Sequence, residues 1–577
     1  MIFYDFEIFK YDWMVCWLDT ETRKMYQIVN DKAKFEKFYK HYKDRVWVGY
    51  NSRNYDQWVA KAILADFDPY LINDWIINQD RKGYEFSRLL NDFPILNYDC
   101  SGSQITLNRS LKELEGFMGH EIKESSVPFD IDRKLTNSEI QEVLKYCKHD
   151  VMETFEVFMH TIEDYESHVG LLQEFGLDIS YISKTKAQLS AIILGASKRE
   201  YKDEFDVSVP DTLQLGKYEW IKDWYLDWGK NVKDYDKMKL KTEVADVDHV
   251  FAIGGLHGSI DNHIGEGYYL MADVASYYPA IMIEYNYLSR NVSNPKKFTM
   301  IRDERIRMKA MKDKRQNPRK IVLNGTYGAS KDKYNSLYDP LQANNVCIAG
   351  QLLLTDLIEK VETNCQLIQS NTDGIMVKLY DKNDDAKIRA ICNEWEKRTR
   401  MDLEFEVYTK VFQKDVNNYI IIPDGELYDS KGKERFKRKG AWVKQLSPLD
   451  NNLPIVNKAI VDYFTQGISP EQTILGCDKL IDFQIITKVG RKYDYAYHNG
   501  KILHERVNRC FASKNQSDET LYKKHKSKVT LDKVANTPDN LFIDNSNVTE
   551  KSVPTNLDKQ WYVNLAKDRI KQFMGEK

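Results

Sequence analysis

The sequence predicts an α/β protein built from several domains. Its 577 residues exceed what one ordinary domain holds, and its hydrophobic content of 42% is enough for large cores. Short strand-like runs, such as "MIFYDFEIF" at residues 1–9 and "RVWVGYN" at 45–51, are followed by residues 138–165, which carry apolar side chains at helical spacing. Strands and long helices in one chain indicate a mixed α/β fold.

The remaining elements follow in order. Residues 165–250 are expected to be mostly helical. The run "GYYLMADV" (267–274) is typical of a strand and leads into "YYPAIMIEY". A basic helix comes next, and a second helix is expected to start near Asn317-Pro318, because proline suits a first helical turn and asparagine can cap it. Beyond it we expect another helix, a hairpin around 368–375, a helix over 384–400, more strands and, after about residue 445, a separate helical and irregular module.

Charge and cysteine content narrow the functional classes. The net charge is only −3, but residues 294–320, 431–440 and 521–528 are strongly basic, which is typical either of a nucleic-acid binder or of solvated helix faces. The eight cysteines are scattered without a CxxC pair, which argues against structural zinc and a disulfide framework. With no signal peptide and no apolar run long enough to span a membrane, we expect a soluble protein in a reducing, cytoplasmic setting.

Four acids in the amino-terminal part form a first candidate site. Asp5 and Glu7 are two apart on a strand, so their side chains share one face. Asp56 follows a strand-like segment, and Tyr146 precedes Asp150 by one helical turn. Each fragment alone is also common in ordinary surface structure. Together, four carboxylates can hold two divalent ions about 4 Å apart for phosphodiester hydrolysis, and a tyrosine hydroxyl could orient the attacking water.

A second set of residues has the chemistry of a nucleotide site. Asp373 lies in a short polar turn between two apolar runs, as in a hairpin that carries a metal-binding aspartate. In "KIVLNGTYG", three side chains suited to phosphate, sugar and base fall on one helical face: Lys320, Asn324 and Tyr327. On the preceding helix, Arg305 and Lys309 could also meet a triphosphate, or could be ordinary surface charge.

In order along the chain, these patterns resemble those of family B DNA polymerases with a 3′–5′ proofreading exonuclease. The matching strings are D-x-E, N-x-x-x-Y-D and Y-x-x-x-D, followed by D-x-x-S-x-Y-P, K-x-x-x-N-G-x-Y-G and T-D, between Asp5 and about Trp442. In size the chain is most similar to compact phage replicases. Only about forty residues separate successive polymerase motifs, too few for the insertions of protein-primed members.

The resemblance implies a ribonuclease H-like exonuclease domain followed by a right-hand polymerase domain. The expected parts are residues 1–165 as exonuclease, 166–250 as a mostly helical connection, 251–299 and 336–445 as palm, 300–335 as fingers, and 446–577 as thumb and C-terminal region.

It also implies roles for single residues. Tyr146 would orient water, and Tyr278 would lie under the incoming sugar and exclude a 2′-hydroxyl. The implied metal ligands are Asp5, Glu7, Asp56 and Asp150 in the exonuclease and Asp273 and Asp373 in the polymerase. The implied DNA contacts are Asn51, Ser110, Leu111, Gly254, Gly255, Thr372, Tyr419, Lys437 and Lys439.

The sequence departs from the family pattern at a few positions. Asn371 stands where the family has the first aspartate of the D-T-D turn, Gly325 where serine is usual, and Asn417 where a lysine is usual. Asparagine keeps the size and acceptor oxygen of aspartate but loses the charge, and it is a good turn residue. We interpret the turn as working with altered surroundings; a disabled polymerase is the alternative.

The resulting expectation is a template-dependent DNA polymerase of a phage, with an exonuclease in the same chain. Each site would use two Mg²⁺ or Mn²⁺ ions. The expected partners are primer–template DNA, dNTPs, single-stranded DNA at the exonuclease site and other replication proteins, with a monomer in the host cytoplasm and no membrane contact. Three rivals remain: an exonuclease whose palm only grips DNA, a non-catalytic replication scaffold, and a reverse transcriptase or RNA polymerase.

Overall fold

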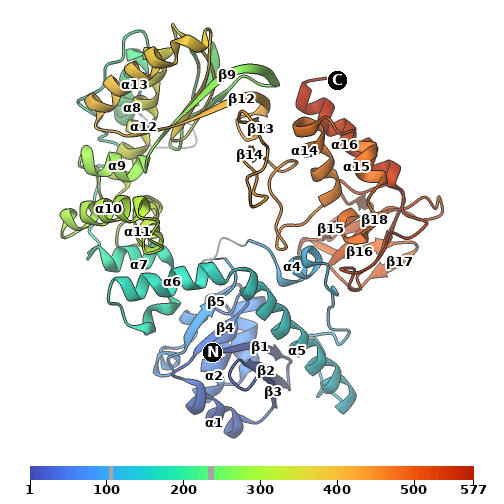
Figure 1. The fold of residues 1–577 in the computed structure, drawn as a ribbon. Coiled ribbons are helices and arrows are strands. Elements are labelled where there is room, and N and C mark those ends of the chain that lie inside the picture. Colours follow the sequence, from blue (N-terminus) through green and yellow to red (C-terminus); the bar gives the residue numbers. More distant parts are fainter. Residues whose placement is uncertain (103–107, 232–238, 577) are drawn as a thin grey trace. The chain divides into compact units, whose positions relative to one another are not determined.

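The computed structural model describes residues 1–102, 108–231 and 239–576, and it has a mixed α/β fold with several sheets (Figure 1). The chain divides into two compact units, and neither is one continuous stretch of sequence. Unit 1 consists of Met1–Thr185, Leu446–Ile455 and Leu475–Tyr562, and unit 2 of Lys186–Gln445, Val456–Ile474 and Val563–Lys577.

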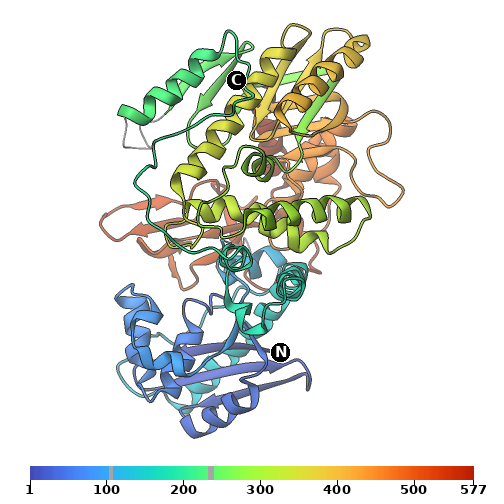
Figure 2. The same cartoon turned by 90° about the vertical axis from the view of Figure 1, so that its left-hand side faces the viewer.

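A five-stranded sheet forms the first part of unit 1, in blue in Figure 2. Its strands are β1 (Ile2–Ile8), β2 (Trp13–Asp19), β3 (Lys24–Val29), β4 (Val46–Gly49) and β5 (Leu96–Asp99). Their order is β3-β2-β1-β4-β5. The first three strands pair antiparallel, whereas β1, β4 and β5 run parallel.

Strand β1 separates two helical layers. Its even-numbered apolar residues join a core with helices α1 (Lys32–Tyr42) and α2 (Asp56–Leu64). On the other face, the ring of Phe3 packs at 5.1 Å from both Phe155 and Phe158 of α5 (Asn137–His160). Because side chains alternate along a strand, the remaining odd-numbered residues of β1 are also directed toward α5.

The C-terminal part of unit 1 differs from the helical and irregular module that the sequence predicts. Residues 485–543 form two small antiparallel sheets instead. One holds β15 (Ile485–Lys488), β18 (Val507–Ala512) and β21 (Leu541–Ile543), and the other β16 (Tyr493–His498), β17 (Lys501–Leu503), β19 (Tyr522–His525) and β20 (Leu531–Lys533). Lysines and tyrosines dominate several of these strands, so the apolar alternation that reveals a strand is weak.

A buried arginine joins these sheets to the amino-terminal part of unit 1. The Arg509 side chain is fully buried and donates to the carbonyl oxygens of Gly116 at 3.1 Å, His120 at 2.7 Å and Ser546 at 2.6 Å. Gly116 belongs to the last turn of α4 (Leu111–Met118), where helical carbonyls lack partners within the helix, and His120 directly follows the C-cap residue Gly119. Arg509 therefore caps α4 from the C-terminal part of the sequence.

The shorter or peripheral helices of the amino-terminal part are α3 (Pro69–Asn73) and α6 (Ile162–Glu174).

Unit 2 is built on a nine-stranded antiparallel sheet. The strands in spatial order are β14 (Lys437–Lys439), β13 (Asn418–Ile422), β12 (Leu403–Asp415), β9 (His263–Val274), β11 (Gly374–Leu379), β10 (Cys365–Asn371), β8 (His257–Ser259), β7 (Val247–Phe251) and β6 (Leu240–Val244). Strands β6 and β7 lie in the segment that we expected to be mostly helical. They form a hairpin whose turn, Ala245-Asp246, has φ of 52° and 60°, the backbone that two-residue hairpin turns require.

Unit 2 also contains helices, of which α12 (Pro340–Val361) contacts strands β10 and β11 of this sheet. The helices are α7 (Lys186–Ile193), α8 (Glu219–Asn231), α9 (Tyr277–Glu284), α10 (Pro295–Ala310), α11 (Gln316–Lys331), α12 and α13 (Asp385–Thr399), together with most of α14 (Pro454–Gln466), α15 (Pro470–Leu475) and α16 (Lys559–Met574). Helix α12 is buried almost throughout and packs against α9 and α11. Among the described residues, no helix is both long and apolar enough to cross a bilayer.

Candidate active sites

Four carboxyl groups of unit 1 lie close enough to influence one another, and we call them the four-acid site: Asp5, Glu7, Asp56 and Asp150. Asp5 and Glu7 are on the face of β1 that is turned to α5, as their spacing predicts. Their carboxylate oxygens and the Cys147 thiol of α5 all lie within 4.8 Å of one another. Asp150 is on the same helix.

Asp56 is fixed by the strand beside it. Strand β4 pairs with β1 only at Ile2 and Phe3, so the backbone of β1 lacks a strand partner on that side beyond this point. There the amide of Phe6 donates to Asp56 Oδ1 at 3.1 Å. Asp56 is also the first residue of α2, where the helix dipole favours a negative charge.

Burial raises the pKa of all four carboxyl groups, and their mutual repulsion adds to this effect for Asp5 and Glu7. The pKa of Asp56 rises to about 7 and that of Asp150 to about 6, in both cases chiefly through burial. A cluster of this kind is costly when ionised and gains from a divalent cation, whose preferred ligands include carboxylate oxygens. The donor set therefore fits Mg²⁺ or Mn²⁺.

A lysine that the sequence analysis missed lies in this cluster. Lys112 Nζ donates to Asp150 Oδ1 at 2.6 Å and to Glu115 Oε1 at 2.8 Å, and it lies 4.7 Å from the ring centroid of Tyr146. Although burial by itself lowers the pKa of Lys112, Asp150 and Glu115 raise it above the usual value. A lysine on a short helix normally lies on the surface, so its residue type did not mark it as part of a site. The one sequence signal for Lys112 was its position directly after Ser110 and Leu111, two of the implied DNA contacts.

Tyr146 and His149 complete the α5 side of the site. Burial, with Asp150 adding to it, raises the pKa of Tyr146, so its phenol keeps its proton and can donate a hydrogen bond. His149 Nε2 is 3.7 Å from Glu115 Oε2, and donor atoms of His149, Glu115 and Asp150 lie within 4.8 Å of one another. Neither His149 nor Glu115 was singled out from the sequence.

The implied DNA contacts of unit 1 have local structural roles. Asn51 has φ of 58°, and its amide donates to Asp99 Oδ1 at 2.8 Å. Ser110 caps α4, with its amide and hydroxyl both donating to Glu113 Oε2 at 2.9 Å, and the Leu111 side chain is buried. Asp99, which organises the Asn51 loop, was not predicted.

In unit 2, Asp273 and Asp373 form the second candidate centre, which we call the two-acid site. Asp273 on β9 pairs directly with Gly374 on β11, so the two acids lie at one point of the sheet. A Cβ atom at Gly374 would fall 1.9 Å from Asp273 Oδ1, a distance that only glycine tolerates. The Asp373 carbonyl accepts from the Val274 amide at 2.7 Å, which fixes the turn against β9.

Charged side chains from the neighbouring strands act on this pair. Burial, followed by repulsion from Asp373, raises the pKa of Asp273 to about 6. Burial also raises the pKa of Asp373, while Lys439 and Lys437 of β14 oppose the rise. Glu404, which was not predicted, pairs with Asp273 across β12 and β9. Two carboxyl groups in this environment fit divalent cations as well.

Asn371, which stands in the place of a second carboxylate, lies beside a histidine. Asn371 pairs with His257 across β10 and β8, and its side chain acts on the His257 imidazole. Burial, and then Lys439, lower the pKa of His257, so the pair is neutral near pH 7. The next residue, Thr372, has φ of 57° and packs so closely on Gly255 that a Cβ there would lie 2.4 Å from Thr372 Oγ1.

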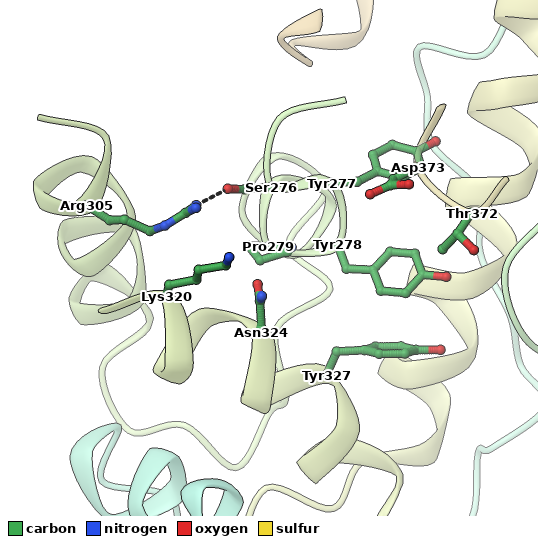
Figure 3. A pocket seen from close by; sticks show the side chains of 10 residues that line it. All are labelled: Ser276, Tyr277, Tyr278, Pro279, Arg305, Lys320, Asn324, Tyr327, Thr372 and Asp373. Atoms are coloured by element: carbon green, nitrogen blue, oxygen red, sulfur yellow. Dashed lines mark hydrogen bonds between the residues drawn. The ribbon is translucent and has the colours of Figure 1, made fainter. Parts of the chain in front are cut away.

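A cavity of about 310 Å³ lies beside Asp373. It brings together residues from α9, α10, α11 and the hairpin turn, as Figure 3 shows. Its lining consists of Ser276, Tyr277, Tyr278, Pro279, Arg305, Lys320, Asn324, Tyr327, Thr372 and Asp373.

The predicted stripe of α11 forms one wall of this cavity. Lys320, Asn324 and Tyr327 all line it, and the ring of Tyr327 lies 4.4 Å from that of Tyr278 (Figure 3). Gly325 lies on the side of α11 that meets α7, where a Cβ would be 3.1 Å from Ser190 Oγ. The close approach of α7 leaves little room for a larger side chain at this position.

The two predicted cations of α10, Arg305 and Lys309, lie in different surroundings. Arg305 lines the cavity and donates to the Ser276 hydroxyl, and its Nε is buried without a partner among the described residues. Lys309 is not part of the lining. It is exposed and pairs with Glu404 at 2.7 Å, because its position on α10 turns it toward β12 rather than toward α11.

The β13–β14 region approaches the two-acid site from another side. Tyr419 is buried, and Asp273 and Asp373 both help to raise its pKa, after burial. Lys437 is ion-paired with Glu406, whereas Lys439 pairs with Tyr419 in the strand register. Gly254 is positioned by Gln351, which donates to its carbonyl at 3.1 Å.

Comparisons with known proteins add little. No protein-family model matches the chain, and no curated protein matches it. Among solved structures, it is similar to the family B DNA polymerase from the hyperthermophilic archaeon Pyrobaculum calidifontis, with 13% identity over 99% of this chain and 77% of that one, at a TM-score of 0.42. At this level the likeness carries no functional argument, so the function has to be inferred from the two sites themselves.

Proposed function

We propose that this protein is a template-dependent DNA polymerase that extends a primer and carries a 3′–5′ proofreading exonuclease. The observation that carries the proposal is the cavity beside Asp373. It combines a carboxylate at one end, the cations Lys320 and Arg305, and the adjacent rings of Tyr278 and Tyr327. These groups suit the reacting phosphate, the rest of the triphosphate, and the sugar and base of one nucleotide.

In the polymerase reaction, the primer 3′-hydroxyl gives up its proton to solvent and its oxygen bonds to the α-phosphorus of a dNTP, while the bond from that phosphorus to the oxygen bridging to the β-phosphate breaks and pyrophosphate leaves. Lys320 and Arg305 are proposed to neutralise the triphosphate, and Tyr278 to support the sugar and exclude a 2′-hydroxyl. Tyr419, Lys437 and Lys439 are proposed to hold the primer strand, with Thr372, Gly254 and Gly255 on the DNA side of the hairpin turn.

Asp273 and Asp373 would hold two Mg²⁺ or Mn²⁺ ions, and the four-acid site would hold two more. Bound there, such ions would supply charge neutralisation and a more acidic hydroxyl or water. The residues of the chain provide the alignment. In the exonuclease reaction, water would attack the last phosphodiester of a frayed single strand, with Tyr146 orienting it and Asn51, Ser110 and Leu111 contacting the strand. The products are a nucleoside monophosphate and a primer shortened by one residue.

One observation favours a second candidate. Asn371 beside His257 leaves the hairpin turn with one carboxylate fewer than the family pattern, so the chain would be a 3′–5′ exonuclease whose nine-stranded unit only grips DNA. Two features weigh against it. Asp273 and Asp373 lie at one point of the sheet, and the cavity beside them contains cations and aromatic rings that suit a nucleoside triphosphate. The proposal includes the copying of a phage genome in the host cytoplasm, because the chain is similar in size to compact phage replicases and its motifs are closely spaced.

The test is a primer-extension gel with a 5′-labelled primer–template and Mg²⁺, with and without dNTPs. We expect the wild type to extend with dNTPs and to shorten without them. Asp373→Ala should only shorten the primer, and Asp5→Ala should only extend it. A wild-type protein that shortens the primer whatever dNTPs are present would establish the exonuclease alone, and an inert one would overturn both activities. Adding rNTPs or an RNA template separates the reverse transcriptase and RNA polymerase rivals.

A further inference from the structure

A tryptophan of unit 2 has two cations beside its ring. Lys414 Nζ lies 4.5 Å from the ring centroid of Trp442, and the guanidinium carbon of Arg569 lies 5.3 Å from it. All three side chains are partly exposed. Each cation is attracted to the face of the ring, but the two like charges oppose each other.

The fold brings these residues together from three distant parts of the sequence. Lys414 is near the end of β12, and Trp442 follows β14 after a turn at Gly440, whose φ is 109°. A Cβ at Gly440 would lie 2.2 Å from Asn418 Oδ1, so only glycine lets this turn lie against the β12–β13 connection. The turn directs Trp442 back toward Lys414.

Helix α16 supplies the arginine and is firmly docked. Phe573, one helical turn after Arg569, packs on Phe464 at 5.3 Å, and Phe464 packs on Phe412 of β12 at 4.9 Å. Asn262 donates to the carbonyls of Gln572 at 3.0 Å and Phe573 at 3.1 Å, which caps the helix. Because residues four apart share a helical face, this docking also sets the position of Arg569.

Neither cation has an anionic partner among the residues that the structure describes. In the part of the chain that the structure describes, no hydrogen bond or ion pair is found for the Lys414 ammonium or the Arg569 guanidinium. Other cations of the same sheet are paired, such as Lys410 with Glu266 and Lys437 with Glu406. Burial lowers the pKa of Arg569 to about 10, so it stays charged at neutral pH.

A third cation without a carboxylate partner connects this cluster to the two-acid site. Lys439 precedes Trp442 by three residues, forms no ion pair among the described residues, and acts electrostatically on Asp373. Lys439, Lys414 and Arg569 therefore belong to one region that begins beside the carboxylates and ends at α16.

From this arrangement, we propose that Lys414, Trp442 and Arg569 form a binding site for a phosphate of the nucleic-acid backbone. The inference rests on the proposed function and deepens it, because the site would hold the primer strand behind its growing end. The two cations supply the counter-charge that a phosphodiester needs, and each of them contacts the indole ring in the absence of DNA. Arginine suits such a contact because its planar donors match phosphate oxygens.

The first test measures primer–template affinity against salt, in EDTA so that no chemistry occurs. Arg569→Met keeps the apolar stem of the side chain and removes its charge. We expect it to weaken binding roughly tenfold and to lower the slope of log Kd against log salt by about 0.9, the value for one lost phosphate contact. Arg569→Lys should keep most of the slope. Lys571→Met, an exposed charge on the same helix, is the matched control and should change Kd less than twofold.

The second test locates the phosphate. A neutral methylphosphonate is placed in turn at each of the last linkages of the primer. We expect one linkage whose neutralisation weakens the wild type but has no further effect on Arg569→Met, the signature of a direct pair. Thermal melting checks that the variants are folded.

The outcomes separate this inference from the proposed function. If Arg569→Met and the wild type share the same slope and respond alike at every linkage, the cluster only fastens α16 and the inference is wrong, while primer extension still decides the function. If the slope falls but the wild type never extends a primer, the phosphate site stands and the polymerase proposal fails. A wild type that does not bind primer–template overturns both.

Discussion

The two carboxylate sites of this protein differ in what surrounds their acids. The four-acid site is buried and contains its own cation, Lys112, which bonds to Asp150 at 2.6 Å. At the two-acid site, Asp373 borders a cavity, and the cations Lys320 and Arg305 line that cavity without bonding to either acid. The first arrangement partly compensates its charges within the protein. The second leaves its cations available to a ligand, as a site for a triphosphate requires.

The largest effect that would sharpen this comparison concerns Lys112. Lys112→Met removes the internal cation and leaves Asp150 and Glu115 buried without it, so the local free energy of opening should fall by about 3 kcal/mol in EDTA. Native-state hydrogen exchange of the α5 amides measures this quantity. Mg²⁺ should restore part of the loss.

Lys145→Met, which removes an exposed charge from α5, is the control and should leave exchange unchanged. Equal protection of α5 in Lys112→Met and the wild type, both in EDTA, would mean that the four acids do not depend on the lysine, and the contrast between the sites would disappear.

A smaller effect is expected at Gly374. A Cβ in Gly374→Ala would displace Asp273, whose Oδ1 lies 1.9 Å from that position. Misplacement of a catalytic group by about 1 Å costs on the order of a hundredfold in rate, so single-turnover extension should fall by that factor while primer shortening is unchanged. Gly328→Ala, with open space at the Cβ position on α11, should extend normally. Wild-type extension by Gly374→Ala would exclude Asp273 from the reaction.

The next largest effect is expected in the pH dependence of stability, which should differ between the four-acid site and the two-acid site. Burial raises the pKa of Asp56 to about 7 from an ordinary value near 3.8. Between these values the folded state binds a proton that the unfolded state lacks, so the free energy of unfolding of the metal-free protein falls as pH rises from about 5 to 8. We expect a loss of about 2 kcal/mol, and correspondingly more stabilisation by Mg²⁺ at pH 8 than at pH 5.5.

Thermal melting in EDTA and in Mg²⁺ across this range measures the effect. Asp56→Asn should flatten the profile, whereas Asp273→Asn should change it less, because the pKa of Asp273 rises only to about 6. Stability that rises with pH in EDTA would contradict the raised pKa of Asp56.

The smallest effect is expected for Asn371→Asp. The Asn371 side chain is engaged with His257 and does not line the cavity, so a carboxylate there should change the extension rate by less than about threefold. Steady-state extension with a single dNTP measures it. A gain of tenfold or more would show that asparagine disables the turn, and the rival function of an exonuclease with a DNA-gripping unit would gain strength.

Periodicity predicted much of this structure. The spacing of Asp5 and Glu7 placed both on one face of β1, and the stripe of Lys320, Asn324 and Tyr327 does line one cavity. These predictions succeed because they depend only on the geometry of one strand or one helix. Their roles in catalysis and in DNA binding stay predictions.

The sequence did not reveal features that depend on contacts between distant segments. In the sequence, Lys112 and Arg509 both look like surface charges. Only the packing of α5 against α4 brings Asp150 to Lys112, and only the fold brings Arg509 to the end of α4. Lys309 looks equivalent to Arg305 until β12 offers Glu404 as a partner. In each case the deciding partner lies more than thirty residues away, beyond the reach of any local pattern.

The capping of α4 by Arg509 has a consequence for synthesis. Helix α4 follows Ser110, but the arginine that bonds to the carbonyls at its end emerges from the ribosome about four hundred residues later, some tens of seconds at typical elongation rates. Unit 1 needs the chain as far as Tyr562, and unit 2 needs the residues after it. A chain that stops before Tyr562 therefore leaves both units incomplete, so the four-acid site and the cavity beside Asp373 reach their final surroundings only near the end of synthesis.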